Sequence, residues 1–291
     1  MYFRIANTFN LSSSYIRYIH QLRLLLKLVP KKSHAYVNDY HYHLQAAIYS
    51  LIREGGLPEV HEKRGYKFFC FSNIFPFGDL KQGVERNLLV SSPDHAIIES
   101  IEHAAFSKIK SGQPLVMGEL QFAISDVSKP FRINLEGPEI TVHSATPIVL
   151  RIPKIRYEEY GIKPKVDYDY VFWRETISLG AFVKQLRDNI AKKAKEYLEG
   201  QGENSSEQVL YSNEEAFLPA VVSYKFIRSV AKPITVKGDR QIIIGSIWDI
   251  SFRAESADLT RTLGIALDSG LGERNSLGFG FMNAAETGRR P

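Results

Sequence analysis

The order in which strand-like and helix-like segments follow one another constrains the fold of this chain more than any other feature. In the first half, apolar strand-like runs alternate with segments whose apolar residues recur at helical spacing, as Leu44, Ile48 and Leu51 do. The expected segments are a strand over 22–30, a helix over 42–55, strands over 67–74 and 86–90, a helix that opens at 92–94, and a strand over 116–127. This β-α-β-β-α-β order is that of the ferredoxin-like unit.

The second half repeats this rhythm less cleanly. Its expected segments are one or two strands over 139–152, a strand over 167–173, a helix over 178–198, strands over 220–230 and 241–253, and a helix over 256–270. Because 291 residues are about twice the usual domain size, we expect an α+β fold with two tandem ferredoxin-like (RRM-like, βαββαβ) domains, over 21–130 and 131–291. The polar segment 200–207 is expected to be a mobile loop.

Composition excludes several classes of protein. No apolar run approaches the ~18–20 residues that span a bilayer, and the N-terminus lacks the residue order of a secretory signal, so we expect no membrane association. The single cysteine, Cys70, excludes an internal disulfide and a cysteine-cluster zinc site. Its aromatic neighbours predict a small buried residue, which suits a reducing cytoplasm. A net charge of +5 and a pI near 9.1 modestly favour a polyanionic partner such as nucleic acid.

The segment over 270–280 carries the sharpest motif, with four glycines in eleven residues. Glycine allows positive φ and lets backbone N–H groups approach a ligand, and concave arrays of such groups bind phosphate. No Gly-Lys-Ser/Thr ends the segment, and it follows a helix and opens a strand, so it is neither a Walker loop nor a dinucleotide fingerprint. From the glycine spacing alone, a structural helix-to-strand turn is equally compatible. The candidate RNA-binding residues here are Gly270, Gly272, Arg274, Asn275, Ser276, Gly278 and Gly280.

A glycine-rich loop that ends Asn-Ser-Leu-Gly-Phe-Gly near the C-terminus resembles the signature of the CRISPR-associated RAMP superfamily. Within it, the chain is most similar to the Cas-six endoribonucleases, which cut CRISPR repeat RNA. The stretches Tyr42–Tyr49, Val60–Phe69 and Ser144–Val149 agree with this resemblance, which covers about residues 21–284 and implies tandem ferredoxin-like folds. Residues 1–20 precede the usual start of the family, either as an added terminal element or because a start codon is assigned too far upstream.

The resemblance implies three catalytic residues, Tyr49, His61 and Lys67. RNA cleavage without a metal ion uses the adjacent 2′-OH as nucleophile and displaces the 5′ oxygen. A histidine can move a proton near neutral pH, a lysine can neutralise charge on the pentacoordinate phosphate, and a tyrosine can orient that phosphate. Without the resemblance, a lone histidine followed by glutamate in a loop is typical of a solvated side chain.

Several alternatives stay open at this point. His41, just before the first expected helix, or His43, at its start, could share or replace the role of His61. A zinc site built from these two histidines is a weaker alternative, because it lacks a cysteine partner and suitable spacing. Lys154 and Arg156 lie in a basic, tyrosine-containing run over 151–165 that could hold RNA phosphates. The octamer over 64–71 approximates an RNA-recognition motif, but a lysine occupies one of its small-residue positions.

The expected function is therefore a metal-independent endoribonuclease that cleaves CRISPR precursor RNA within its repeats to generate guide crRNAs, and we expect no cofactor and no metal ion. The alternative is a non-catalytic RAMP subunit that binds crRNA in an effector complex. A third candidate is an RNA-binding module without a CRISPR role. The expected partners are CRISPR repeat RNA, other effector subunits and a second copy of the chain in a homodimer.

Overall fold

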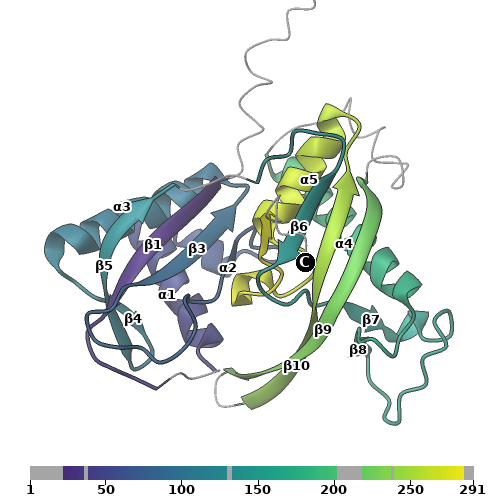
Figure 1. The fold of residues 1–291 in the computed structure, drawn as a ribbon, viewed down its shortest axis with the longest axis horizontal. Coiled ribbons are helices and arrows are strands. Elements are labelled where there is room, and N and C mark those ends of the chain that lie inside the picture. Colours follow the sequence, from purple (N-terminus) through teal and green to yellow (C-terminus); the bar gives the residue numbers. More distant parts are fainter. Residues whose placement is uncertain (1–21, 36–38, 130–132, 202–217, 237–238, 285–291) are drawn as a thin grey trace, which may run out of the picture.

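The computed structural model describes residues 22–35, 39–129, 133–201, 218–236 and 239–284. The expected N-terminal extension over 1–20 and most of the expected mobile loop over 200–207 lie outside these residues. The described part forms two antiparallel sheets with helices packed on them and one separate hairpin (Figure 1).

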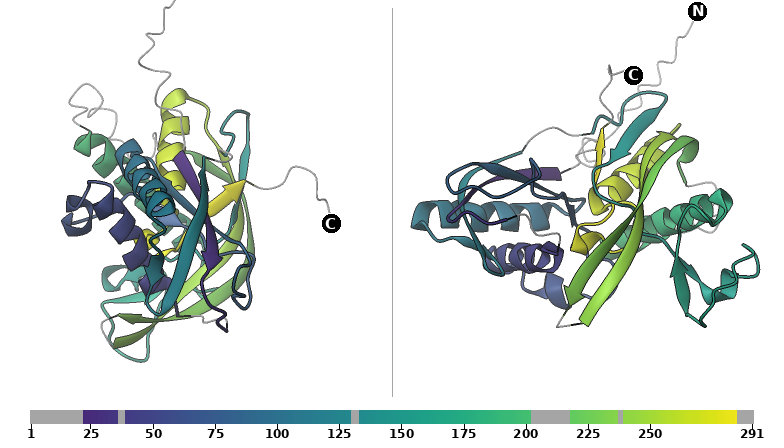
Figure 2. Two further views of the ribbon diagram at one scale, coloured as in Figure 1. Left: turned by 90° about the vertical axis from the view of Figure 1, so that its left-hand side faces the viewer. Right: turned by 60° about the horizontal axis from the view of Figure 1, so that its bottom comes forward.

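The first sheet follows the ferredoxin-like order. Its half of the chain contains β1 (Leu22–Pro30), α1 (His41–Glu54), α2 (Glu59–Glu62), β2 (Cys70–Phe71), β3 (Arg86–Ser92), α3 (His95–Ser111), β4 (Leu115–Met117) and β5 (Leu120–Ser128). The strands are arranged β2-β3-β1-β5-β4, and α1 and α3 lie on the same side of the sheet (Figure 2). Apart from the short helix α2 and the extra edge strand β4, this is the predicted βαββαβ unit.

The second sheet has the same topology with one insertion. Its half contains β6 (Ile140–Ser144), β7 (Arg151–Pro153), the 3₁₀ helix η2 (Lys154–Arg156), β8 (Tyr170–Phe172), α4 (Leu179–Gly200), β9 (Ala220–Val236), β10 (Asp239–Arg253), α5 (Ala257–Ser269), the 3₁₀ helix η4 (Asn275–Leu277) and β11 (Met282–Ala284). The strand order is β11-β6-β10-β9, and β7 and β8 form a hairpin of their own. The predicted α+β class with two ferredoxin-like folds is confirmed, while the boundary near residue 130 stays a prediction.

Two strand predictions were wrong in their extent. The run over 67–74 forms regular strand only at Cys70–Phe71. Phe68, with a φ of 51°, interrupts the extended backbone before this strand. The run over 116–127 is a hairpin rather than one strand, since Gly118 with a φ of 61° turns the chain between β4 and β5.

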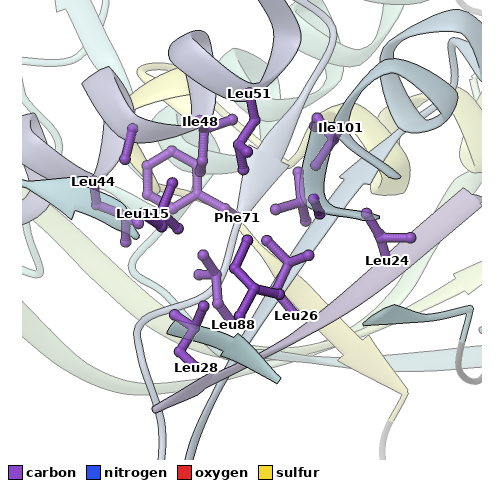
Figure 3. Packing of buried hydrophobic residues seen from close by; sticks show 14 of the residues in the cluster. Leu24, Leu26, Leu28, Leu44, Ile48, Leu51, Phe71, Leu88, Ile101 and Leu115 are labelled. Carbon is purple, nitrogen blue, oxygen red and sulfur yellow. The ribbon is translucent and has the colours of Figure 1, made fainter. Parts of the chain in front are cut away.

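Each sheet has its own hydrophobic core. In the first, alternate residues of β1 (Leu24, Leu26 and Leu28) are fully buried under the apolar stripe of α1 (Figure 3). In the second, Trp248 of β10 stacks on Phe182 of α4 with ring centroids 4.1 Å apart. Alternation in strands and helical spacing in α1 therefore place the apolar residues as the sequence patterns predict.

Polar contacts also join the two halves. Arg23 of β1 is buried and donates to the carbonyl of Met282 at 2.6 Å and to Asn283 Oδ1 at 3.1 Å. Near the tip of the β9–β10 hairpin, the Thr235 hydroxyl donates to Asp39 Oδ2 at 2.6 Å, just before α1. Within the described residues, no helix is long and apolar enough to cross a bilayer.

Candidate functional site

Tyr49, His61 and Lys67 meet on the surface of the first half. The rings of Tyr49 and His61 lie edge to face, with centroids 4.9 Å apart. Lys67 Nζ donates to the backbone carbonyl of His61 at 2.9 Å and also to the carbonyl of Lys63. Tyr49 comes from α1, His61 from α2 and Lys67 from the segment before β2, so three separate elements supply the cluster.

The three side chains differ in their environments. The His61 side chain is exposed, which leaves its ring open to a ligand. Burial raises the pKa of Tyr49, and a hydrogen bond with Ser276 opposes part of that rise. Partial burial, together with the nearby charge of Lys63, lowers the pKa of Lys67. The cluster thus combines an accessible imidazole, a neutral phenol and an amine that is less basic than a free lysine.

An unusual backbone conformation places the segment that carries Lys67. Phe68 adopts a left-handed conformation, which is strained for a bulky residue. Its carbonyl accepts a hydrogen bond from the Ser92 hydroxyl at 2.6 Å, and its ring packs edge to face on Tyr197 of α4. Contacts from both halves of the chain therefore hold this strained residue next to the cluster.

One face of α1 meets the glycine-rich loop. His41, Gln45 and Tyr49 follow one another at a spacing of four residues and so share this face. Gln45 Nε2 donates to Ser276 Oγ at 3.3 Å, and the same serine lies close enough to Tyr49 to oppose part of the rise in the pKa of the phenol. The second half of the chain thus reaches the cluster through Ser276.

The two alternative histidines occupy different positions. His41 is buried and its ring is stacked near that of Phe279, at 6.0 Å between centroids. His43 is exposed, but its ring lies against Gly118 in the β4–β5 turn. Since each helical residue turns by about 100°, the directions of His43 and Tyr49 around α1 differ by about 120°. The structure therefore brings His61, and not His43, to the tyrosine.

The four loop glycines are all buried and have positive φ values between 73° and 87°. A Cβ atom on Gly280 would lie 1.9 Å from the carbonyl oxygen of Leu271, and one on Gly272 would lie 2.5 Å from that of Val149. A Cβ atom on Gly278 would meet the ring of Phe71 at 2.5 Å. The loop therefore needs glycine at these positions in order to pack between the two halves.

Many of the loop's backbone N–H groups donate inside the protein. Those of Leu271, Glu273 and Gly280 donate to the carbonyls of Gly280, Val149 and Pro147 at 2.8–2.9 Å. Asn275 is buried, and its Nδ2 donates to two loop carbonyls. Arg274 is exposed and Ser276 is partly exposed, so these two side chains are the ones that the loop offers to a ligand.

Lys154 and Arg156 lie away from the cluster. Both belong to η2 beside the β7–β8 hairpin, and in Figure 1 this hairpin lies to the right of β9 and β10 whereas α1 and α2 lie to the left. Lys154 pairs with Asp167 at 2.7 Å and Arg156 pairs with Asp188 at 2.8 Å. Exposed ion pairs of this kind contribute little stability, so the Lys154 pair in particular leaves its cation available to a polyanion.

Sequence reasoning missed two features of the structure. A groove of about 880 Å³ lies between the two halves, with Phe75 on one side and Arg228, Lys232 and His143 on the other. Its walls come from segments far apart in the chain, so no local pattern indicated it. The second feature is Lys193, a buried lysine that occupies the apolar stripe of α4 three residues after Ile190. A charged residue on a buried helix face was the signal that could have identified it.

Among the described residues, no three histidine, cysteine, aspartate or glutamate side chains gather as metal ligands would.

Solved structures show the class of fold. A structure described as an RAMP protein binding different RNA substrates matches with a TM-score of 0.64 and 19% identity, covering 91% of this chain and 100% of that chain. The product of a Cas6-related gene from Pyrococcus furiosus matches with a TM-score of 0.63 and 19% identity, covering 92% and 100%. The fold is thus that of the RAMP proteins.

The family follows from sequence comparison. A family model for CRISPR associated protein Cas6, C-terminal, matches residues 134–284, which is more than half of the chain. The chain belongs to the Cas6 family. It is 27% identical over 271 residues to the CRISPR-associated endoribonuclease Cas6 of Haloferax mediterranei, covering 91% of this chain and 94% of that protein. It is 29% identical over 273 residues to the CRISPR-associated endoribonuclease Cas6 2 of Methanocaldococcus jannaschii, covering 90% and 99%.

The packing of the loop predicts a large cost for Gly280→Ala. The added methyl group would overlap the Leu271 carbonyl in a conformation that L residues rarely adopt, so the free energy of unfolding should fall by more than ~2 kcal/mol. The control is Gly180→Ala in α4, where no atom lies within 4 Å of an added Cβ and the change should stay within ~0.5 kcal/mol or stabilise. Urea unfolding followed by circular dichroism measures both. Equal effects would contradict the packing role of the loop.

Proposed function

We propose that this protein is a metal-independent endoribonuclease that cleaves CRISPR precursor RNA within its repeats to generate guide crRNAs. The observation that carries the proposal is the meeting of Tyr49, His61 and Lys67 beside the glycine-rich loop of a Cas6 family member. Two relatives that align with about nine-tenths of the chain are named CRISPR-associated endoribonucleases. These three residue types are sufficient for RNA cleavage by an internal nucleophile.

In the proposed reaction, the 2′-oxygen next to the scissile phosphate attacks phosphorus as the bond from phosphorus to the 5′ oxygen breaks. The products are a 2′,3′-cyclic phosphate and a 5′-hydroxyl. The 2′-OH loses a proton and the leaving 5′ oxygen gains one, and His61 transfers a proton at one of these two atoms. Its exposed ring on the short helix α2 allows an RNA phosphate to approach.

Lys67 and Tyr49 act on the phosphate itself. The Lys67 amine stabilises the extra negative charge of the pentacoordinate phosphate, leaving its present backbone acceptors as RNA binds. Tyr49, a neutral phenol whose pKa is raised further by burial, donates a hydrogen bond that orients a phosphate oxygen. Lys63 and Arg64, both exposed beside His61, add positive charge at the same place.

RNA outside the scissile bond contacts cationic and polar surfaces. Arg274 is the exposed cation of the glycine-rich loop, and Arg228 and Lys232 line the groove between the halves. Contacts of RNA with the loop glycines, with Asn275, and with Lys154 and Arg156 stay predictions. So do contacts with other effector subunits, a homodimer and the cytoplasmic location.

The role of His61 predicts the outcome of a cleavage experiment. A labelled repeat RNA is incubated with excess protein in EDTA, and single-turnover rates are measured. His61→Ala should slow cleavage by ~10²–10⁴ while RNA affinity stays nearly unchanged, because the imidazole acts mainly in the transition state. Lys67→Ala should reduce both rate and affinity, since its charge also meets the ground-state phosphate. The control His43→Ala, exposed on another face of α1, should cleave at the wild-type rate.

Each contrary outcome supports a different reading. Tight binding of repeat RNA by the wild-type protein without cleavage would favour the non-catalytic RAMP subunit, and sequence-indifferent binding would favour a general RNA-binding module. Wild-type cleavage by His61→Ala would refute the assignment. His43→Ala and His41→Ala would then show whether the proton carrier lies at the start of α1.

The exposed position of Arg274 predicts its contribution to binding. If Arg274 contacts an RNA phosphate, the Arg274→Ala variant should bind RNA more weakly across repeat sequences. The slope of the logarithm of the RNA-binding constant against the logarithm of the salt concentration should fall by about one phosphate contact. The control Arg274→Lys keeps the charge and should retain most of that slope. Titrations at several salt concentrations measure it. An unchanged affinity and slope in Arg274→Ala would leave the loop with a packing role only.

A further inference from the structure

Lys193 of α4 is buried beneath the glycine-rich loop. Its Nζ donates to the carbonyl of Gly270, to the carbonyl of Gly272 at 2.6 Å and to Asn275 Oδ1 at 2.7 Å. An ammonium group has three N–H donors and no acceptor, so these three acceptors match its full donor capacity. Asn275 is fixed in turn, because its Nδ2 donates to the carbonyls of two other loop residues.

Lys193 also faces the segment that precedes Lys67. Its Nζ lies 5.6 Å from the ring centroid of Tyr66. Two further residues of α4 hold the same tyrosine, since Asn189 Nδ2 donates to its hydroxyl at 3.3 Å and Glu196 Oε1 accepts from its backbone N–H at 3.0 Å. One helix of the second half therefore contacts both the chain leading into Lys67 and the loop that carries Ser276.

These contacts adjoin Lys67 of the cluster on one side and Ser276 of the loop on the other. Tyr66 precedes Lys67, and Asn275 precedes Ser276, whose hydroxyl accepts from Gln45 of α1 and lies beside the Tyr49 phenol. We propose that Lys193 is a positioning residue that sets the Tyr49–Ser276 contact and the Lys67 segment in the geometry needed for cleavage. This inference rests on the proposed function and concerns the same site.

Packing alone does not account for a lysine here. Burial of a charged group is costly unless hydrogen bonds compensate for it, and an apolar side chain of similar length would fill the same space without that cost. Burial lowers the pKa of Lys193 to about 7, and the nearby Cys70 and Glu273 oppose part of that fall. The three hydrogen-bond acceptors around Nζ favour the charged form of the amine. The ammonium supplies what an apolar residue lacks, which is three directed contacts to one loop.

Lys193→Met tests the proposal, with Lys192→Met as a matched control, because Lys192 is the neighbouring residue on the exposed face of α4. With saturating protein, Lys193→Met should cleave repeat RNA ~10–100-fold more slowly than the wild type, since small misplacements of catalytic groups cost about this much. The RNA Kd should stay within about threefold and the thermal unfolding transition should remain cooperative. Lys192→Met should match the wild type in all three measurements.

Two additions keep the test decisive. If Lys193→Met does not fold, Lys193→Arg replaces it, because a guanidinium keeps the charge but cannot direct three N–H groups from one nitrogen at the same acceptors. It should fold, bind RNA and cleave at least ~10-fold more slowly than the wild type. Amide hydrogen exchange over 271–280 gives a readout independent of cleavage, and it should be at least ~10-fold faster in the Lys193 variant than in Lys192→Met.

The outcomes separate this inference from the proposed function. A wild-type protein that cuts no repeat RNA refutes the proposed function, and the exchange measurement then still tests whether Lys193 orders the loop. A folded Lys193 variant that cleaves at the wild-type rate, or loses rate only in proportion to its RNA affinity, refutes the positioning role. Unchanged exchange over 271–280 in a folded variant refutes it as well.

Discussion

The glycine-rich loop packs tightly against both halves of the molecule, and the geometry of the candidate site depends on that packing. Gly278 lies against Phe71 of the first sheet, and Gly272 lies against the backbone of Val149 in the second half. No side chain fits at either position. The buried ammonium of Lys193 donates to carbonyl groups of the loop, so the loop has little freedom to shift relative to either sheet. A rigid support of this kind suits a site whose residues come from short, exposed elements.

The cluster itself occupies the surface of one half but is completed by the other. α2 has only four residues, and Phe68, whose ring lies against the Lys63 ammonium, has a strained backbone conformation. Phe68 of this segment packs on Tyr197 of α4, and Ser276 of the loop lies beside Tyr49 and accepts from Gln45 on the same face of α1. Separation of the halves would therefore leave the three side chains without the contacts that orient them.

Much of this arrangement could be predicted from the sequence. The order of the elements follows from local periodicity, and Tyr49, His61 and Lys67 are close in the chain, so a resemblance over one short stretch was enough to group them. The role of the loop glycines was only half predicted. Their spacing indicated positive φ, which is confirmed, but whether the glycines serve a ligand or packing depends on atoms of Phe71, Val149 and Leu271 that no local pattern shows.

The contacts of Lys193 and the walls of the groove could not be predicted, because the partners are distant in sequence. A lysine is normally exposed, and only its place in the apolar stripe of α4 argued otherwise. The short extent of β2 had a different cause. The run over 67–74 is apolar enough for a strand, but the backbone turns at Phe68 to present Lys67, so the tertiary environment overrides local propensity.

The central claim is that Tyr49 of the first half and Ser276 of the second act as one unit in RNA cleavage. A double-mutant cycle with Tyr49→Phe and Ser276→Ala, measured as single-turnover cleavage of repeat RNA, tests it most directly. If the serine acts by orienting the phenol, the double variant should cleave no more slowly than Tyr49→Phe alone. Rate losses that multiply in the double variant would show that the two residues act independently and would contradict the account.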